Sequence, residues 1–428
     1  MTGAPLTQSG TEAAETAQAF TPPSSAAGEP SGGQPLPDPP AYGRRSVAEI
    51  LPSSAAALGV PGFENALGLP AVPRVCVVMV DGLGRQLLTQ HAAHAPFLRA
   101  KLQAGQGGIP TTLDAAFPST TAASLASFGT GLPAGQHGMV GYDVLAPHLG
   151  RVVNQLGGWD PDVDPDHWQP FPTVFERMEA TVPVATVSLP QFERSAMTRA
   201  ALRGGAFIGA ETLHARTRAA AEAMAAAPRM LLYFYLNELD KAGHLSGCAS
   251  PTWEEALEEV DASIRRLDGQ LPSGTLVLVT GDHGMVDVAA HRRIDFGAEP
   301  ELIDGVRHTA GEPRMVHLHL EDPNDDGAAR RVLDRWRARF GRHAWIMTRA
   351  EAVAKGLFGA VRPEVLERIG DILVAVHGEL ALYDGRRVRP TAFAMVGQHG
   401  SLTKAERNVP LVAFHAAGRA QSKRRRRG

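Results

Sequence analysis

Seven residues along the chain are of the types that bind metal ions or attack phosphorus, and we expect them at strand ends and in the adjoining loops. They are Asp81, Thr121, Asp240, His244, Asp282, His283 and His399. Imidazole and carboxylate ligands together suit zinc better than manganese or iron. Seven groups are too many for one tetrahedral site but suit two adjacent metal ions, which clamp the attacking and leaving oxygens of phosphoryl transfer. The set therefore predicts a two-zinc site for phosphate-ester chemistry.

Each member of this set also has a purely structural alternative. Asp240 and His244 could form a hydrogen-bonded pair in a loop, and His399 could be a loop histidine whose hydrogen bonds are satisfied. An Asp-His-Gly sequence such as that at Asp282 is common after a strand. The joint pattern favours a site, because an α/β sheet gathers such residues at one edge.

The nucleophile is predicted within residues 117–131, FPSTTAASLASFGTG. This stretch is typical of a short helix that carries Thr120 or Thr121 in its first turn and has Gly131 just past its end. The N-terminus of a helix can hold a phosphate group, and metal coordination is one way to activate a threonine hydroxyl. The alternative is that these hydroxyls only cap the helix.

Three apolar runs that each end in an aspartate must position these residues. They cover residues 74–81, 230–240 and 275–282 and are typical of buried parallel strands. Helical patterns occur at 85–103, 212–227 and 251–267. The sequence therefore predicts an α/β fold with a mostly parallel central sheet flanked by helices. Ligands bind at the carboxyl edge of such a sheet, where we expect the three aspartates.

Composition divides the chain into five segments. Residues 1–43 are rich in Pro, Gly, Ser and Ala and predict a disordered tail. Residues 44–299 and 373–418 are assigned to the catalytic core, and residues 371–376 are expected to return to its sheet. Residues 300–372 are assigned to an inserted α+β cap subdomain. Residues 419–428 end in Lys-Arg-Arg-Arg-Arg-Gly and predict a short, basic, disordered tail.

The overall composition is that of an ordinary globular protein. Of the 428 residues, 44% are hydrophobic, and the net charge is −3. With so small a net charge, the protein has no strong overall electrostatic field that would favour a membrane surface or a nucleic acid as partner. We expect neither a membrane span nor a secretory signal. Two cysteines, Cys76 and Cys248, are too few for a disulfide framework and favour a reducing compartment, the cytoplasm.

The order and spacing of these motifs resemble those of a known family. Asp81 follows an apolar strand, Thr121 precedes Gly131 by ten residues, and Asp240-x-x-Gly-His244, Asp282-His283-Gly284 and Gly-x-His399-Gly follow in turn. Together they resemble the alkaline phosphatase superfamily, specifically its nucleotide pyrophosphatase/phosphodiesterase branch. The resemblance covers about residues 74–414.

This resemblance implies a role for each residue. Thr121 rather than Thr120 would be the nucleophile, because the family's nucleophile lies ten residues before the glycine, and it would form a phosphothreonine intermediate. The implied ligands of one zinc ion are Asp240, His244 and His399, and those of the other are Asp81, Asp282, His283 and Thr121 Oγ. The implied activity is hydrolysis of a phosphodiester or pyrophosphate linkage in a small, nucleotide-like substrate.

The phosphate pocket departs from the family pattern. Where the branch often carries an asparagine whose amide contacts a phosphate oxygen, this chain has Tyr142. Its hydroxyl could donate one hydrogen bond to substrate, or the ring could only pack the pocket wall. For the guanidinium clamp of a monoesterase the sequence offers three unranked candidates, Arg194, Arg293 and Arg314.

Other functions are compatible with the same residues. A phosphomonoesterase and a metal-dependent phosphomutase of the same superfamily would use the same metal ligands. A sulfatase is disfavoured, because neither cysteine lies in the Cys/Ser-x-Pro-x-Arg setting of those enzymes. A non-catalytic binding module is disfavoured because all seven expected site residues are present.

Overall fold

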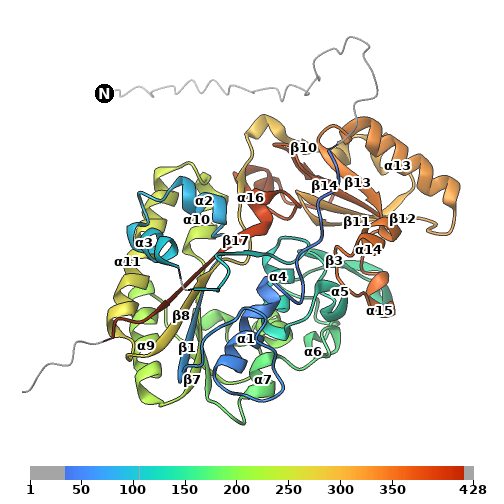
Figure 1. The fold of residues 1–428 in the computed structure, drawn as a ribbon. Helices are drawn as coiled ribbons and strands as arrows, with labels where there is room; N and C mark the ends of the chain where they lie inside the picture. Colours follow the sequence, from blue (N-terminus) through green and yellow to red (C-terminus); the bar gives the residue numbers. More distant parts are fainter. Residues whose placement is uncertain (1–33, 106, 419–428) are drawn as a thin grey trace, which may run out of the picture. The chain divides into compact units, whose positions relative to one another are not determined.

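The computed structural model describes residues 34–105 and 107–418 (Figure 1). Most of the predicted N-terminal tail and the predicted basic tail at 419–428 lie outside these residues. Residues 34–43, which the sequence assigns to the tail, contact the rest of the chain. The Ala41 amide donates to Asp114 Oδ2 at 3.0 Å, and Tyr42 Oη accepts a hydrogen bond from the Phe117 amide at 3.1 Å.

A seven-stranded central sheet forms one half of the fold, with the order β2-β17-β8-β1-β7-β5-β6. Its strands are β1 (Arg74–Val80), β2 (Thr112–Asp114), β5 (Val184–Ser188), β6 (Ala206–Gly209), β7 (Met230–Leu236), β8 (Thr275–Thr280) and β17 (Asn408–His415). β1 pairs in parallel with β7 and β8, and β5 pairs in parallel with β6 and β7. β17 is antiparallel to β8. The predicted α/β fold with a mostly parallel sheet is confirmed.

Both faces of this sheet are covered by helices (Figure 1). Along β1, Val75, Val77 and Met79 pack into one apolar cluster, and residues 76, 78 and 80 pack into another. The first cluster includes side chains of α1 (Ile50–Ala57) and α4 (Thr121–Thr130). The second includes side chains of α9 (Leu213–Ala226) and α11 (Pro251–Gln270). Because a strand buried on both faces needs no polar side, its sequence is continuously apolar.

Capping residues set the ends of the helices. Ser250 caps α11 by accepting a hydrogen bond from the Trp253 amide, and Pro251 occupies its first turn. The single helix predicted over 85–103 is wrong: the structure has α2 (Arg85–Gln90) and α3 (Pro96–Ala104). Pro96 lacks the N–H that would continue a helix, so the second helix begins at that residue.

A second sheet contains six strands in the order β13-β14-β12-β11-β3-β4, all paired antiparallel. They are β3 (Asp143–Ala146), β4 (Arg151–Asn154), β11 (Val306–Glu312), β12 (Met315–Leu320), β13 (Ala344–Thr348) and β14 (Ile372–Val376). The second sheet therefore extends beyond the predicted cap at 300–372, because it also includes β3 and β4. The expected return of residues 371–376 to the central sheet is wrong, because β14 pairs with β12 and β13. Its apolar run shows burial but not which sheet buries it.

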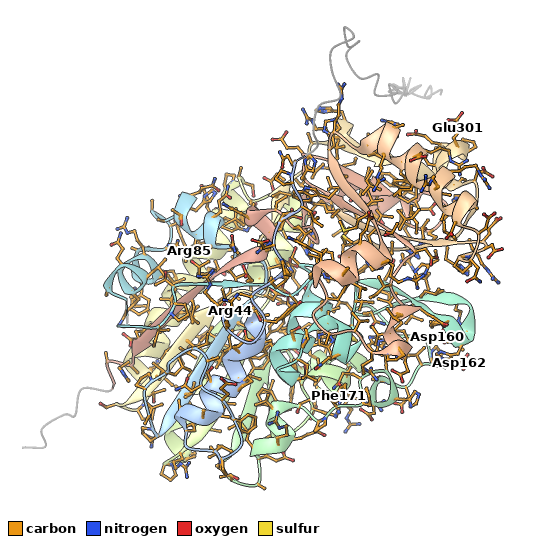
Figure 2. All side chains as sticks on the ribbon, turned by 45° about the vertical axis from the view of Figure 1, so that its right-hand side comes forward. Arg44, Arg85, Asp160, Asp162, Phe171 and Glu301 are labelled. Atoms are coloured by element: carbon orange, nitrogen blue, oxygen red, sulfur yellow. The ribbon has the colours of Figure 1, made fainter. Side chains whose placement is uncertain are left out.

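Charged side chains such as Asp162 and Glu301 are exposed at the surface (Figure 2). Among the residues that the structure describes, none of the helices combines the length and apolar character needed to cross a bilayer.

Candidate functional site

The seven predicted site residues come from both halves of the sequence, and loops or helix starts at the central sheet carry most of them. Asp81 directly follows β1, and Asp282 and His283 follow β8. Asp240 does not lie at a strand end as expected but in the first turn of α10 (Glu238–Ser246). His244 is four residues later, so both side chains lie on the same face of this helix.

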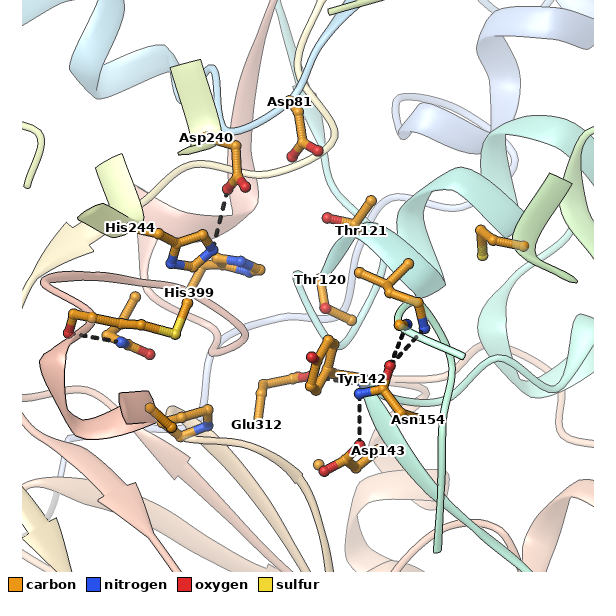
Figure 3. Close-up of a pocket in the computed structure, with 18 of the residues that line it drawn as sticks. Asp81, Thr120, Thr121, Tyr142, Asp143, Asn154, Asp240, His244, Glu312 and His399 are labelled. Carbon is orange, nitrogen blue, oxygen red and sulfur yellow. Dashed lines mark hydrogen bonds and ion pairs between the residues drawn. The ribbon is translucent and has the colours of Figure 1, made fainter. Parts of the chain in front are cut away.

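The structure brings six of these residues into two groups. Figure 3 shows Asp240, His244 and His399 of the first group and Asp81 of the second. The ligand atoms of Asp240, His244 and His399 all lie within 4.8 Å of one another. Those of Asp81, Asp282 and His283 form a second group with the same spacing. The rings of His283 and His399 are stacked with their centroids 3.6 Å apart, so the two groups are adjacent.

Backbone carbonyl groups determine which nitrogen of each histidine faces the site. Nδ1 of His244 lies 2.8 Å from the Gly397 oxygen, and Nδ1 of His283 lies 2.9 Å from the Gly284 oxygen. Nδ1 of His399 lies 3.0 Å from the Ser119 oxygen. A carbonyl can only accept, so Nδ1 carries the proton in the neutral rings. Nε2 is then left with its lone pair directed at the site, as in metal-binding histidines.

The atoms that face these nitrogens are also acceptors. His244 Nε2 lies 3.3 Å from Asp240 Oδ1, and His283 Nε2 lies 3.4 Å from Asp81 Oδ1. Asp81 Oδ1, Asp240 Oδ1 and Asp282 Oδ2 are buried without a hydrogen-bond partner. Buried carboxylate oxygens without partners are costly unless a cation offsets their charge. The donor set therefore fits divalent metal ions.

Burial and mutual repulsion shift the acid–base properties of these ligands. Burial raises the pKa of the Asp81 carboxyl well above its usual range, and the charges of Asp240 and Asp282 raise it further. Burial also raises the pKa of Asp240. It lowers the pKa of His399 well below its usual range, which keeps this ring in the neutral form that binds metal.

Thr121 is the first residue of α4, and its Oγ1 lies 3.1 Å from His283 Nε2. The side chain is buried, with 6% of its surface exposed. Thr120 occupies the N-cap position, but its hydroxyl is buried and makes no hydrogen bond. The Thr121 hydroxyl is thus the one that joins the group of Asp81, Asp282 and His283.

A cavity of about 970 Å³ opens onto this site. Its lining includes Asp81, Thr120, Thr121, Asp240, His244 and His399, and also Tyr142. Tyr142 is 37% exposed, and its backbone N–H donates to Glu312 Oε2 at 2.9 Å. Aromatic and apolar side chains form much of the remaining wall, among them Leu125, Phe192, Met197, Phe207 and Tyr235.

None of the three arginines proposed as a phosphate clamp lines this cavity. Arg314 is buried in an ion pair, Arg293 donates to backbone carbonyl groups, and Arg194 is exposed. Arg387 and Arg389 line the cavity instead. The sequence could not rank these candidates, because Arg194 and Arg314 lie outside helices and strands, and the strand of Arg293, β10 (Arg293–Asp295), is too short for a periodic pattern.

Two further cavity residues were missed by sequence reasoning. The Tyr235 hydroxyl donates to Asp81 Oδ2, and Glu312 places a carboxyl near the site with its Oε1 lacking a partner. A tyrosine within the apolar run of β7 was the available signal, because a buried phenol hydroxyl usually finds a partner. No signal marked Glu312, whose position depends on the pairing of β11 with β3.

Comparison with known proteins adds independent evidence. Residues 75–402, well over half of the chain, match the family described as Type I phosphodiesterase / nucleotide pyrophosphatase. GPI ethanolamine phosphate transferase 2 from Eremothecium gossypii is 42% identical over 62 residues, which are 14% of this chain and 8% of that protein. The chain thus matches less than a tenth of that relative's length.

Solved structures share the fold at low sequence identity. An inactive variant of murine ectonucleotide pyrophosphatase/phosphodiesterase 5, in complex with AMP, is similar with a TM-score of 0.61 and 15% identity, over 81% of this chain and 88% of that one. Phosphonoacetate hydrolase from Sinorhizobium meliloti, in complex with phosphonoformate, has a TM-score of 0.57 and 19% identity, over 80% of this chain and 89% of that one. The chain therefore belongs to the type I phosphodiesterase/nucleotide pyrophosphatase family, a family of phosphodiesterase-like hydrolases in the alkaline phosphatase superfamily.

Proposed function

We propose that this protein hydrolyses a phosphodiester or pyrophosphate linkage, with Thr121 as nucleophile beside two zinc ions. The observation that carries the proposal is the position of Thr121 Oγ1, 3.1 Å from His283 Nε2, in a site whose other facing atoms are acceptors. Asp240, His244 and His399 would hold one ion, and Asp81, Asp282 and His283 the other. When bound, the ions would lower the pKa of the nucleophile and neutralise charge on the phosphoryl oxygens.

The chemistry proceeds in two displacements. Thr121 Oγ1 bonds to phosphorus as the bond to the leaving ester oxygen breaks, which leaves a phosphothreonine whose phosphorus keeps one organic substituent. The Thr121 hydroxyl gives up its proton in this step, and the leaving oxygen takes one up. Water then attacks the same phosphorus and loses a proton, and the released threonine oxygen takes one up. The first turn of α4 begins at Thr121, and its backbone N–H groups would stabilise the phosphoryl oxygens.

The proposed substrate is a small nucleotide-like ester. The cavity of about 970 Å³ has room for one, and Phe192 and Tyr235 in its wall are T-shaped at 6.0 Å, an apolar surface for a base or aryl group. The murine relative was solved with AMP, which supports this class. A cytoplasmic location is part of the proposal, and the free, buried state of Cys76 and Cys248 supports it.

Transfer of the phosphoryl group to a second substrate instead of water is the second candidate. The local identity to a GPI ethanolamine phosphate transferase favours it. Product analysis separates the two: hydrolysis releases only a phosphate monoester and an alcohol, whereas transfer gives a new ester when an acceptor alcohol is added.

The test compares thymidine p-nitrophenyl phosphate with p-nitrophenyl phosphate as substrates of the zinc-loaded protein. Thr121→Ala is expected to lower kcat/KM for the diester by at least about a thousandfold, which corresponds to ~4 kcal/mol. Thr120→Ala, which removes the neighbouring unpartnered hydroxyl, is the matched control and should retain most activity. Unchanged turnover by Thr121→Ala would refute the assignment of the nucleophile.

A further inference from the structure

A fully buried ion pair joins the second sheet to the part of the chain that follows His399. Arg314 lies in the turn between β11 and β12, and Glu406 lies in α16 (Lys404–Arg407). Arg314 Nε and Nη2 donate to the two Glu406 oxygens at 2.7 and 2.9 Å. The two side chains are 1% and 0% exposed. Because desolvation offsets most of the attraction in such a pair, stability alone does not explain it.

The guanidinium group of Arg314 is held in place by backbone carbonyl groups. The three guanidinium N–H groups that do not face Glu406 donate to the carbonyl oxygens of Val376, Gly378 and Leu380, at 3.1, 2.8 and 2.9 Å. All five N–H donors of the group are therefore used. A guanidinium held in this way presents its remaining two donors to Glu406 in one orientation only.

Glu406 in turn contacts both loops that carry histidines of the site. Its Oε1 accepts a hydrogen bond from the Ser401 amide at 3.0 Å, two residues after His399. Its backbone oxygen accepts one from the Gly284 amide at 2.6 Å, one residue after His283. One residue thus contacts a loop of each candidate metal group.

Close backbone packing leaves these loops little freedom to adjust. A Cβ added at Gly284 would lie 2.0 Å from the Ala405 oxygen, so the loop of His283 lies directly against the segment that carries Glu406. The loop of His399 is also held by Ser119, which lies two residues before the proposed nucleophile. The Ser119 hydroxyl donates to the Ser401 backbone oxygen at 2.6 Å. The spacing of the stacked His283 and His399 rings is therefore set by residues that lie outside the site.

We propose that Arg314 and Glu406 are positioning residues that hold the two metal-binding groups at their working separation. The inference rests on the proposed function, because it assigns the pair to the same two-metal site. Neither side chain lines the cavity, so neither touches substrate. Breaking the pair should let the two histidine loops separate. This should weaken metal binding, without a direct effect on the reaction itself.

The experiment measures zinc affinity of the metal-free full chain by competition with a chromophoric chelator. Glu406→Gln and Arg314→Met are each expected to lower the affinity by about 10- to 100-fold, the range seen when groups that orient metal ligands are removed. Arg314→Lys, which keeps the positive charge but not the planar set of donors, should give a smaller loss. This graded order across three variants keeps the test valid if one of them fails to fold.

The matched control is Arg349→Met, which breaks the partly buried ion pair between Arg349, the first residue of α14 (Arg349–Lys355), and Asp371, directly before β14. Its melting temperature should fall while zinc affinity stays within about twofold, because neither residue contacts the site loops. Equal losses of zinc affinity in the control, or unchanged affinity in the Glu406 and Arg314 variants, would overturn the proposal. A wild-type protein that binds no zinc would contradict the proposed function itself, whereas normal zinc binding by the variants would contradict only the positioning role.

Discussion

At the scale of single residues, the main feature of the site is that several of its buried polar atoms lack a hydrogen-bond donor. The neutral histidine Nε2 atoms and the carboxylate oxygens opposite them are all acceptors, and a metal ion between them would satisfy both. The structure brings the seven residues chosen for their types and spacing close together, and their roles stay predictions. Residue types and spacing could not predict which histidine nitrogen faces the site, because that depends on carbonyl groups such as those of Ser119 and Gly397, which are distant in sequence.

Tyr235 offers a test of how the ligands are oriented. Its hydroxyl donates to Asp81 Oδ2, so Tyr235→Phe should leave this carboxylate free to rotate. We expect zinc affinity to fall about tenfold. Tyr233→Phe is the control, because that hydroxyl is buried without a partner and its loss should leave zinc affinity unchanged. Similar affinities for both variants would show that the phenol does not orient Asp81.

At the scale of elements, helices carry more of the site than the sequence indicated. The sequence predicts the apolar run at 230–240 as one strand that ends in an acid, but β7 ends at Leu236 and α10 begins at Glu238. The mixed apolar and polar residues of that segment are compatible with the end of a strand or the start of a helix. A single turn of helix is too short to show a helical period in the sequence. Helix α4, which carries the proposed nucleophile, agrees well with its prediction: it spans Thr121–Thr130, and Gly131 follows it in the left-handed conformation with φ 73°.

The position of α4 depends on close packing against α8 (Ala196–Ala201). A Cβ at Gly129 would lie 1.7 Å from the Ala201 oxygen, so Gly129→Ala must push the two helices apart. We expect this overpacking to lower the free energy of unfolding by about 1–3 kcal/mol, measured by urea denaturation. Gly269→Ala in α11 has no atom within 4 Å of the added methyl and should be neutral or stabilising. Equal stability of the two variants would contradict this description of the packing.

At the scale of the whole molecule, the core could be predicted from sequence much further than its surroundings. The three apolar runs and their aspartates indicated the central sheet, because strands buried on both faces have a continuous apolar signal. The second sheet was underestimated, since β3 and β4 lie more than 150 residues before β11 in the sequence. Their pairing depends on contacts such as Gly311 with Asp143, which no local pattern encodes. The cavity is lined by residues of both sheets, so its shape was equally hidden.

Metal removal should affect the stability of the whole molecule. Ions that bind only the folded state stabilise it by about 4 kcal/mol when their free concentration is about a thousand times the dissociation constant. We therefore expect a chelator to lower the melting temperature and added zinc to restore it. The buried carboxylates of the two groups repel one another without a cation, which adds to the effect. A melting temperature that does not respond to chelator or zinc would count against the metal site.

The most direct test of the central claim is to identify the covalent intermediate. The zinc-loaded protein is mixed with bis-p-nitrophenyl phosphate, quenched in acid within the first turnover, digested and analysed by mass spectrometry. We predict a p-nitrophenyl phosphoryl group on Thr121, formed as the first p-nitrophenol is released and lost in the Thr121→Ala variant. Rapid release of p-nitrophenol with no adduct on Thr121, or with the adduct on Thr120, would contradict the account.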